Sequence, residues 1–258
     1  MRDTQRVVLI TGGSGGLGRA LARSFARNGS PVVITSRNKS RLEAVAAEIN
    51  REGGHALALS CDVGQKDAVE RLASDVENQV GSVEVLINNA GIAPAVSFLE
   101  MPDSVWHEVL NINLSGTYNC CKTFLPAMIR SRWGRIINIA STTAKVAYSH
   151  VSAYTSSKHG VLGLTRSLAL ESAKAGVTVN AICPGYLDTQ LTHKSAVLMA
   201  QKTGKTVAEV INIFAGTSPQ NRLIAPEEVA SLALLLASDK AAAITGQAIN
   251  VDGGAVMV

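Results

Sequence analysis

Two residues that can move a proton stand four positions apart, Tyr154 and Lys158 in the run YTSSK. At this spacing the phenol and the amine share one face of a helix. A phenol with a cation beside it can donate a proton to a carbonyl oxygen or take one from an alcohol. Ser141 stands thirteen residues before Tyr154. These residues predict chemistry at a carbonyl or a secondary alcohol.

A glycine-rich turn, TGGSGGLG at 11–18, lies between the apolar run VVLI and a helical pattern. Gly12, Gly16 and Gly18 would let the backbone approach a pyrophosphate, whose charge the N–H groups of a helix start stabilise. Glycines also occur in turns that bind nothing. The evidence for a pyrophosphate site is therefore the position of these glycines between a strand and a helix. We expect a dinucleotide cofactor.

The choice of cofactor is expected at the end of the second strand, which reads TSRN at 35–38. An acidic residue there would hold the ribose 2′-hydroxyl of NAD, and a basic residue the 2′-phosphate of NADP. Ser36 stands where an acid would be expected, and Arg37 follows it. A planar guanidinium favours NADP(H), and NAD(H) stays open.

Short apolar runs alternate with helical patterns along the whole chain. The runs are apolar on both faces, as in strands of a buried parallel sheet, and they lie at 7–10, 32–35, 56–61, 83–88, 135–140, 178–182 and 247–251. Helices are expected at 17–28, 40–52, 66–80, near 104–131, near 152–175 and at 226–237. The alternation predicts an α/β fold: one Rossmann-like domain over 1–258, with a doubly wound parallel sheet of about seven strands and helices on both faces.

The composition excludes several classes of protein. The chain has 258 residues, is 47% hydrophobic and 17% charged, and carries a net charge of +4, so nucleic acid is not an expected partner. No stretch approaches ~20 apolar residues and no signal-peptide segment is recognised, so we expect no membrane and a cytoplasmic location. The four cysteines, two of them adjacent, indicate reduced thiols, and no metal site is expected.

One long stretch, 186–222, separates a strand from the next core helix. It reads as two short amphipathic helices, and an insertion at the carboxyl edge of a parallel sheet lies where ligands bind. We expect a lid over the substrate. Tyr186, in this stretch, and His150, just before the catalytic tyrosine, are candidate residues of the substrate pocket.

Seven segments stand in a characteristic order: TGGSGGLG at 11–18, CDV at 61–63, NNAG at 88–91, NINLSG at 111–116, YTSSK at 154–158, PGYLDT at 184–189 and ITGQAINVDGG at 244–254. Together they resemble the short-chain dehydrogenase/reductase family over essentially the whole chain. The resemblance implies a catalytic tetrad of Asn113, Ser141, Tyr154 and Lys158. Lys158 would lower the tyrosine pKa and bond the nicotinamide ribose, and Asn113 would order a water that leads to the lysine.

The resemblance also implies contacts with the cofactor. Those expected besides the tetrad pair Tyr154 and Lys158 are, along the chain, Gly12, Ser14, Gly16, Leu17, Gly18, Arg37, Asp62, Val63, Asn89, Ala90, Gly91, Pro184, Gly185, Leu187 and Thr189. Thr11 and Asn88 are expected to stabilise the sheet, and Asp252 to shape the last strand and a subunit contact. A homo-oligomer, in particular a tetramer, is the assembly that the family implies.

The local likeness at 140–161 is to reductases of 3-oxoacyl thioesters and of polyketides. The leading prediction is reduction of a 3-oxoacyl thioester, on coenzyme A or an acyl carrier protein. Arg132 matches one of two basic residues that dock a carrier, whereas Ala175 fills the second position. The alternatives are polyketide ketoreduction, an NAD-linked dehydrogenase of 3-hydroxyacyl-CoA, hydroxybutyrate or a secondary alcohol, and a dinucleotide-sensing protein without activity.

Overall fold

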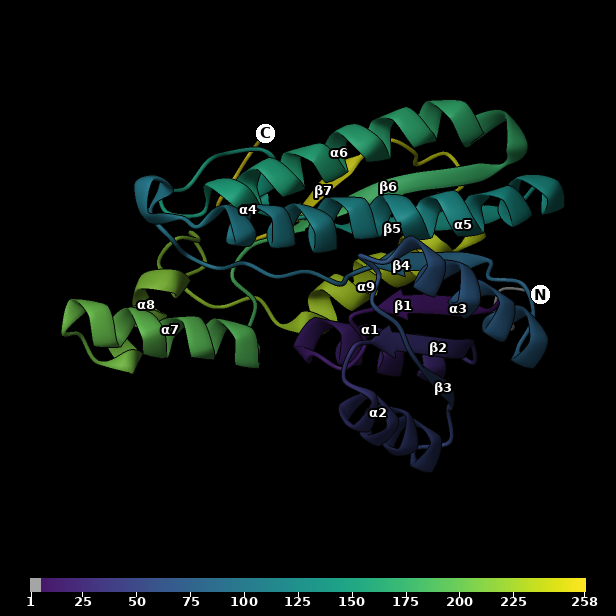
Figure 1. Cartoon of the computed structure of the whole chain (residues 1–258), viewed down its shortest axis with the longest axis horizontal. Coiled ribbons are helices and arrows are strands. Elements are labelled where there is room, and N and C mark those ends of the chain that lie inside the picture. Colours follow the sequence, from purple (N-terminus) through teal and green to yellow (C-terminus); the bar gives the residue numbers. More distant parts are fainter. Residues whose placement is uncertain (1–5) are drawn as a thin grey trace.

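The computed structural model describes residues 6–258, which form one seven-stranded sheet covered by helices (Figure 1). The strands are β1 (Val8–Thr11), β2 (Pro31–Ser36), β3 (His55–Ser60), β4 (Val85–Asn88), β5 (Gly134–Ile139), β6 (Val177–Pro184) and β7 (Ala248–Val251). Their order across the sheet is β3-β2-β1-β4-β5-β6-β7, and every neighbouring pair is parallel. The predicted α/β fold with a parallel sheet is confirmed.

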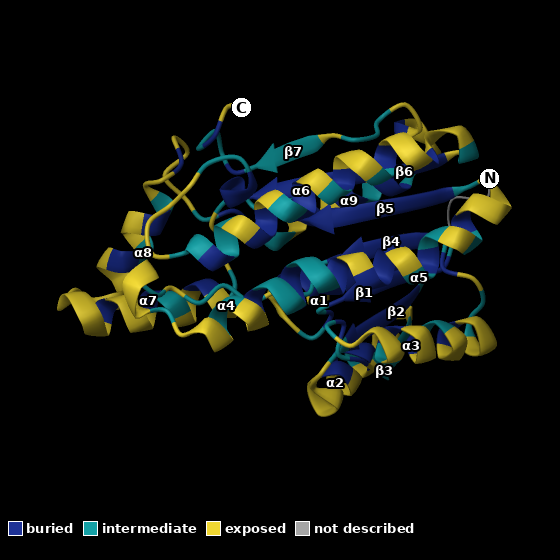
Figure 2. Ribbon diagram, turned by 45° about the horizontal axis from the view of Figure 1, so that its top comes forward, coloured by how far each residue is buried: buried dark blue, intermediate teal, exposed yellow. Residues whose placement is uncertain are grey.

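Helices cover both faces of the sheet. On one face lie α1 (Gly16–Arg27), α2 (Lys39–Arg51) and α9 (Pro226–Ala237), and on the other α3 (Lys66–Gln79), α5 (Gly116–Ser131) and α6 (Ser152–Ser172). Along β1, Val8 and Ile10 pack on the first group and Leu9 on the second, because consecutive strand side chains point to opposite faces. Figure 2 shows the central strands buried and the outer helix faces exposed.

The helix expected near 104–131 is interrupted. It begins as α4 (Asp103–Leu110), passes through a π-helical turn at Asn111–Ser115, and continues as α5. The hydroxyl of Thr117 donates to the carbonyl of Asn113 in this turn at 2.8 Å. A π-turn carries an extra residue and often marks a functional site, and here it holds a tetrad residue.

Two further helices, α7 (Gln190–Thr203) and α8 (Val207–Ala215), project from the body beyond the carboxyl edge of the sheet (Figure 1). Thr189 caps the first helix, and Thr206 with Glu209 forms a capping box at the second. They share a small apolar cluster of their own, which includes Val210 and Phe214. The two helices expected in this stretch are therefore present.

All four cysteines are buried and free, as expected of reduced thiols. Within residues 6–258 no helix is both long enough and apolar enough to cross a membrane. In the same part of the chain, no group of three His, Cys, Asp or Glu side chains gathers in a way that could hold a metal ion.

Candidate active site

The glycine-rich turn lies where the order of strands reverses, between β1 and β4, which is where open α/β sheets bind ligands. The side chain of Thr11 accepts hydrogen bonds from the N–H groups of Asn89 and Ala90, both at 3.0 Å. The Asn89 amide donates to the carbonyls of Thr11 and Gly12 at 2.9 and 3.2 Å. Thr11 thus stabilises the sheet edge as predicted, and Asn89 holds the glycine turn with its side chain.

The glycines of the turn are required by close packing. Gly12 has a φ of +68°, which favours glycine, and a Cβ on Gly18 would overlap the Gly12 carbonyl oxygen. Helix α1 begins after Gly15, and no side chain caps the N–H groups of its first turn. A glycine cradle with backbone donors at a helix start fits a pyrophosphate.

The other residues expected to contact the cofactor near the glycine turn differ in which of their atoms a cofactor could reach. The side chains of Leu17 and Val63 are buried in the core, which leaves only their backbone for a cofactor. Ser14 is half-buried beside the turn. The carboxylate of Asp62 accepts a hydrogen bond from the N–H of Gly64 at 3.0 Å, which fixes its direction at the end of β3.

Arg37 follows β2 with its side chain 58% exposed. Its guanidinium lies 4.0 Å from the carboxylate of Glu108 on α4. An exposed ion pair of this length contributes little stability, so the guanidinium can turn to another anion at small cost. Ser36, the last residue of β2, is polar and uncharged. No acid stands at this position to accept a hydrogen bond from the ribose 2′-hydroxyl of NAD.

The segment after β6 returns to the glycine turn. The N–H of Gly185 donates to the carbonyl of Val251 at 3.1 Å, and Leu187 pairs with Ile224 in an isolated bridge. A Cβ on Gly16 would lie 2.8 Å from the side chain of Thr189. The predicted nicotinamide-side residues, from the buried Pro184 at the end of β6 to Thr189, therefore run toward the start of α1.

Three tetrad residues meet at the carboxyl ends of β5 and β6. Ser141 lies just after β5, and its hydroxyl oxygen accepts the N–H of Thr143 at 3.2 Å. The amine of Lys158 lies 5.6 Å from the centroid of the Tyr154 ring and donates to the carbonyl of Ile139 at 2.7 Å. The structure brings serine, tyrosine and lysine together as predicted.

Burial dominates the electrostatics of this group. It raises the pKa of Tyr154, which a side-chain hydrogen bond with Ser141 opposes, and it lowers the pKa of Lys158 to about 8. Desolvation disfavours the phenolate more than its neighbours favour it, so the pKa of Tyr154 is raised overall, and a lowering of this pKa by Lys158 stays a prediction. At neutral pH the phenol is therefore protonated, which is the form that can donate a proton.

Asn113, the fourth tetrad residue, is completely buried in the π-turn. Its amide oxygen accepts the N–H of Ile92 at 2.9 Å, and its amide nitrogen donates to the Ile92 carbonyl at 2.9 Å and to the Ser157 hydroxyl at 3.0 Å. A Cβ on Gly91 would lie 3.2 Å from the amide oxygen and 3.7 Å from the Lys158 amine. Gly91 thus borders a space that Asn113 and Lys158 share.

The two candidate pocket residues have different surroundings. Tyr186 is 40% exposed, and its ring stacks on Phe214 of α8 with centroids 4.4 Å apart and planes 4° apart. Burial, with Tyr148 as a second cause, raises the pKa of Tyr186. His150 has a φ of +64° and is exposed, and its carbonyl accepts the N–H of Val96 at 2.7 Å.

The structure also shows residues at the site that the sequence patterns did not single out. They are Thr143, whose N–H orients Ser141, and Ser157, whose hydroxyl bonds Asn113. Cys183, which is buried in β6, contributes to the raised pKa of Tyr154, after burial itself. Ser157 stands inside YTSSK, but its type and spacing do not separate it from its exposed neighbour Ser156.

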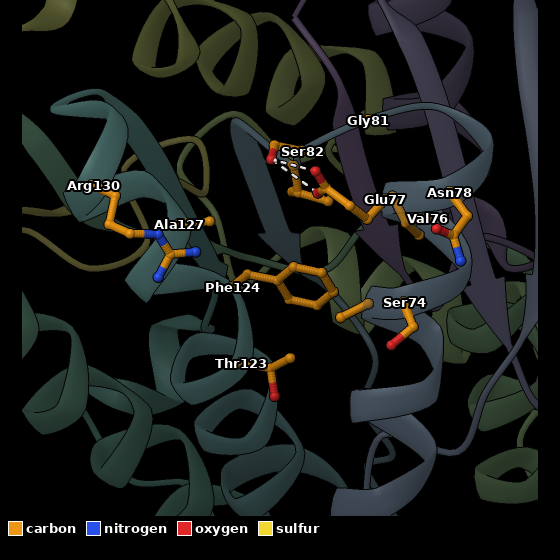
Figure 3. A pocket seen from close by; sticks show the side chains of 12 residues that line it. Ser74, Val76, Glu77, Asn78, Gly81, Ser82, Thr123, Phe124, Ala127 and Arg130 are labelled. Atoms are coloured by element: carbon orange, nitrogen blue, oxygen red, sulfur yellow. Dashed lines mark hydrogen bonds between the residues drawn. The ribbon is translucent and has the colours of Figure 1, made fainter.

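A hollow of about 600 Å³ lies between α3 and α5, at the edge of the sheet opposite the tetrad. Figure 3 shows Phe124 at its centre, Arg130 on one side, and the hydrogen-bonded pair Ser82 and Glu77 on the other. It contains none of the predicted site residues. Arg132, considered for carrier docking, comes at the same end of α5 and donates to the carbonyl of Lys174 at 3.3 Å.

The geometry agrees with comparisons to known proteins. The short chain dehydrogenase family model matches residues 6–197, and the chain belongs to this family of NAD(P)-dependent oxidoreductases. It is 38% identical to the 3-oxoacyl-[acyl-carrier-protein] reductase FabG of Aquifex aeolicus, with 96% of each chain covered. It is 37% identical to the D-beta-hydroxybutyrate dehydrogenase of Rhizobium meliloti, over 96% of this chain and 98% of the relative.

Among solved structures, the chain is similar to a single-substitution variant of actinorhodin polyketide ketoreductase with NADPH. The TM-score is 0.94, the identity is 35%, and 98% of each chain is covered. The likeness extends over nearly the whole chain, and it agrees with the parallel seven-stranded architecture described above.

Proposed function

We propose that the chain is an NADP(H)-dependent reductase that converts a 3-oxoacyl thioester, or a similar β-keto compound, to the 3-hydroxy product. The observation that carries this proposal is the meeting of Tyr154, Ser141 and Lys158 at the carboxyl ends of β5 and β6, with the Lys158 amine 5.6 Å from the centroid of the Tyr154 ring. An acid in its protonated form serves reduction of a carbonyl, in which the oxygen must gain a proton. The relatives include reductases of 3-oxoacyl groups.

The chain's own residues divide the work at the carbonyl oxygen. With its pyrophosphate on the glycine turn, a bound NADPH would supply a hydride to the carbonyl carbon. Tyr154 donates the proton that the oxygen needs. The oxygen of Ser141 accepts the N–H of Thr143, and its hydroxyl proton would stabilise the growing negative charge on the substrate oxygen. Lys158, held on the Ile139 carbonyl, keeps a positive charge near the phenol as its proton leaves.

The preference for NADP(H) rests on Arg37. Its guanidinium is exposed at the tip of β2 and only weakly paired with Glu108. A 2′-phosphate is an anion whose geometry suits bidentate hydrogen bonding by arginine. The NADPH in the similar ketoreductase structure supports the same choice.

We further propose that α7 and α8, within 186–222, act as a lid over the acyl part of the substrate. The stacked rings of Tyr186 and Phe214 tie α8 to the loop that follows β6. Apolar side chains on these two helices stay exposed, namely Leu191, Val197, Leu198 and Ile213. An apolar acyl chain would bury such surface.

Two other reactions have support. Reduction of a cyclic polyketide ketone is favoured by the structural likeness to the actinorhodin enzyme. NAD-linked oxidation of a 3-hydroxy acid is favoured by the identity to the hydroxybutyrate dehydrogenase. A carrier protein and a homotetramer are implied by the family alone, and light scattering of the purified protein would test the tetramer.

The deciding experiment compares initial rates of acetoacetyl-CoA reduction with NADPH and with NADH. A bicyclic ketone such as a decalone, and 3-hydroxybutyrate with NAD⁺, complete the panel, and Tyr154→Phe serves as the inactive control. Turnover of the thioester with a clear preference for NADPH supports the proposal. Turnover of only the bicyclic ketone or only the hydroxy acid replaces it with the corresponding alternative.

A further inference from the structure

The hydroxyl of Ser157 is buried in the catalytic helix and has no part in the reaction as described so far. Ser157 stands between Tyr154 and Lys158 on α6 and is 0% exposed, whereas Ser156 beside it is exposed. Buried hydroxyls need hydrogen-bond partners. The partners of this one are both tetrad residues.

The two hydrogen bonds of Ser157 fix which atom donates and which accepts. Its hydroxyl donates to the carbonyl of Tyr154 at 2.7 Å, and its oxygen accepts the amide nitrogen of Asn113 at 3.0 Å. A hydroxyl has a single proton, and the Tyr154 carbonyl takes it. The oxygen of Ser157 can therefore only accept from Asn113, so it selects the orientation in which the amide N–H₂ faces α6.

This orientation sets what Asn113 presents to the lysine. With its nitrogen on Ser157 and on the Ile92 carbonyl, the amide oxygen lies toward Gly91. The Lys158 amine borders the same space. A carbonyl oxygen near an ammonium group favours the protonated amine, whereas an N–H group would disfavour it.

We propose that Ser157 is a positioning residue, which holds the Asn113 amide against the catalytic helix and so keeps the π-turn, Tyr154 and Lys158 in register. A serine that only bonds the carbonyl of its own helix is common and serves local structure. Ser157 differs because its oxygen also joins α6 to the π-turn at the site. The inference rests on hydride transfer by the tetrad, which the family membership supports, and it does not depend on the thioester substrate.

The test replaces Ser157 by alanine and Ser156, its exposed neighbour, by alanine as the matched control. In Ser157→Ala, one N–H of the Asn113 amide loses its acceptor in a buried site, so the amide and the π-turn shift. We expect kcat to fall at least tenfold, while the Kd for NADPH, measured by fluorescence, changes less than twofold. Ser156→Ala should leave both values unchanged.

The pH profile gives a readout that a merely structural role would not move. When the Asn113 oxygen no longer lies in the space beside Gly91 that the Lys158 amine also borders, the protonated amine is less favoured, so the alkaline limb of kcat for reduction should move to lower pH. The titratable groups near Lys158 are Tyr154 on the same helix and Cys183 on β6, and neither is changed by the substitution. Ser157→Thr, which keeps the hydroxyl, should restore most of kcat and the profile.

Rates are compared on whichever ketone or alcohol of the panel the wild-type protein turns over, so failure of the thioester proposal leaves this test intact. A kcat within twofold of wild type and an unmoved pH profile in Ser157→Ala would overturn the inference. If Ser157→Ala does not fold, Ser157→Cys keeps the volume with a weaker acceptor. A wild-type kcat and pH profile in that variant would refute the role equally.

Discussion

Replacing Lys158 by methionine should make the protein more stable at neutral pH and inactive. Lys158 is 5% exposed, and its only hydrogen bond among the described residues is to the carbonyl of Ile139. Methionine fills a similar volume with an apolar and adaptable side chain. The substitution therefore removes a buried charge and one hydrogen bond while keeping the packing.

The magnitude follows from the pKa of the lysine. Burial lowers that pKa from 10.5 to about 8, so burying the protonated amine costs about 3 kcal/mol more than burying the neutral amine. Losing the hydrogen bond to Ile139 costs roughly 1 kcal/mol. We expect Lys158→Met to raise the free energy of unfolding by about 2 kcal/mol at pH 7.

The direction of the pKa shift determines how the stability difference changes with pH. Since the folded pKa lies below the unfolded one, the unfolded chain binds more protons between about pH 8 and 10.5, and the penalty from Lys158 shrinks as pH rises through this range. It is fully present below pH 8. The advantage of Lys158→Met should therefore fall by about 2.5 kcal/mol between pH 7 and pH 10.

Urea denaturation followed by circular dichroism, at matched ionic strength and without cofactor, measures this difference. Lys194→Met, at an exposed lysine of α7, is the control and should show no comparable pH dependence. A stability difference between wild type and Lys158→Met that is constant from pH 7 to pH 10 would refute the reasoning that burial lowers the lysine pKa.

Three other substitutions test the site. Tyr154→Phe removes the transferable proton, so kcat should fall by about 10²–10⁴ while NADPH binding, followed by fluorescence, is preserved; near-normal turnover would contradict the role of the phenol. Arg37→Asp should lower kcat/KM for NADPH at least tenfold more than for NADH, and equal losses would argue against a 2′-phosphate contact. Gly18→Ala places a Cβ against the Gly12 carbonyl, so it should weaken NADPH binding and lower Tm, and an unchanged Kd would show that the turn can move.

Most of the fold could be predicted because the pattern of apolar residues reports burial directly. Runs such as VVLI and RIINIA are apolar on both faces, and β1 and β5 are indeed covered on both sides. The glycine turn could be predicted for a similar reason, since Gly12 and Gly18 stand where the backbone itself leaves no room for a side chain.

The parts that could not be predicted depend on contacts between elements distant in the chain. The periodicity at 104–131 is compatible with one helix, and only the bonds of Asn113 to Ile92 and Ser157 show why the turn widens there. The direction in which the pKa of Tyr154 shifts could not be predicted from the sequence either. It depends on how far β5, β6 and α6 shield the phenol from water, which the spacing of tyrosine and lysine does not reveal.

One physical cause connects the two shifted groups. Desolvation disfavours the charged form of each, so it raises the pKa of Tyr154 and lowers that of Lys158. The two effects reinforce each other, because a lysine that gives up its proton more easily can restore the proton that the tyrosine donates. With a lysine pKa of about 8, the amine is still mostly protonated at neutral pH. At neutral pH Tyr154 and Lys158 thus both carry a proton, and the proposed reduction of a carbonyl depends on this state of the pair.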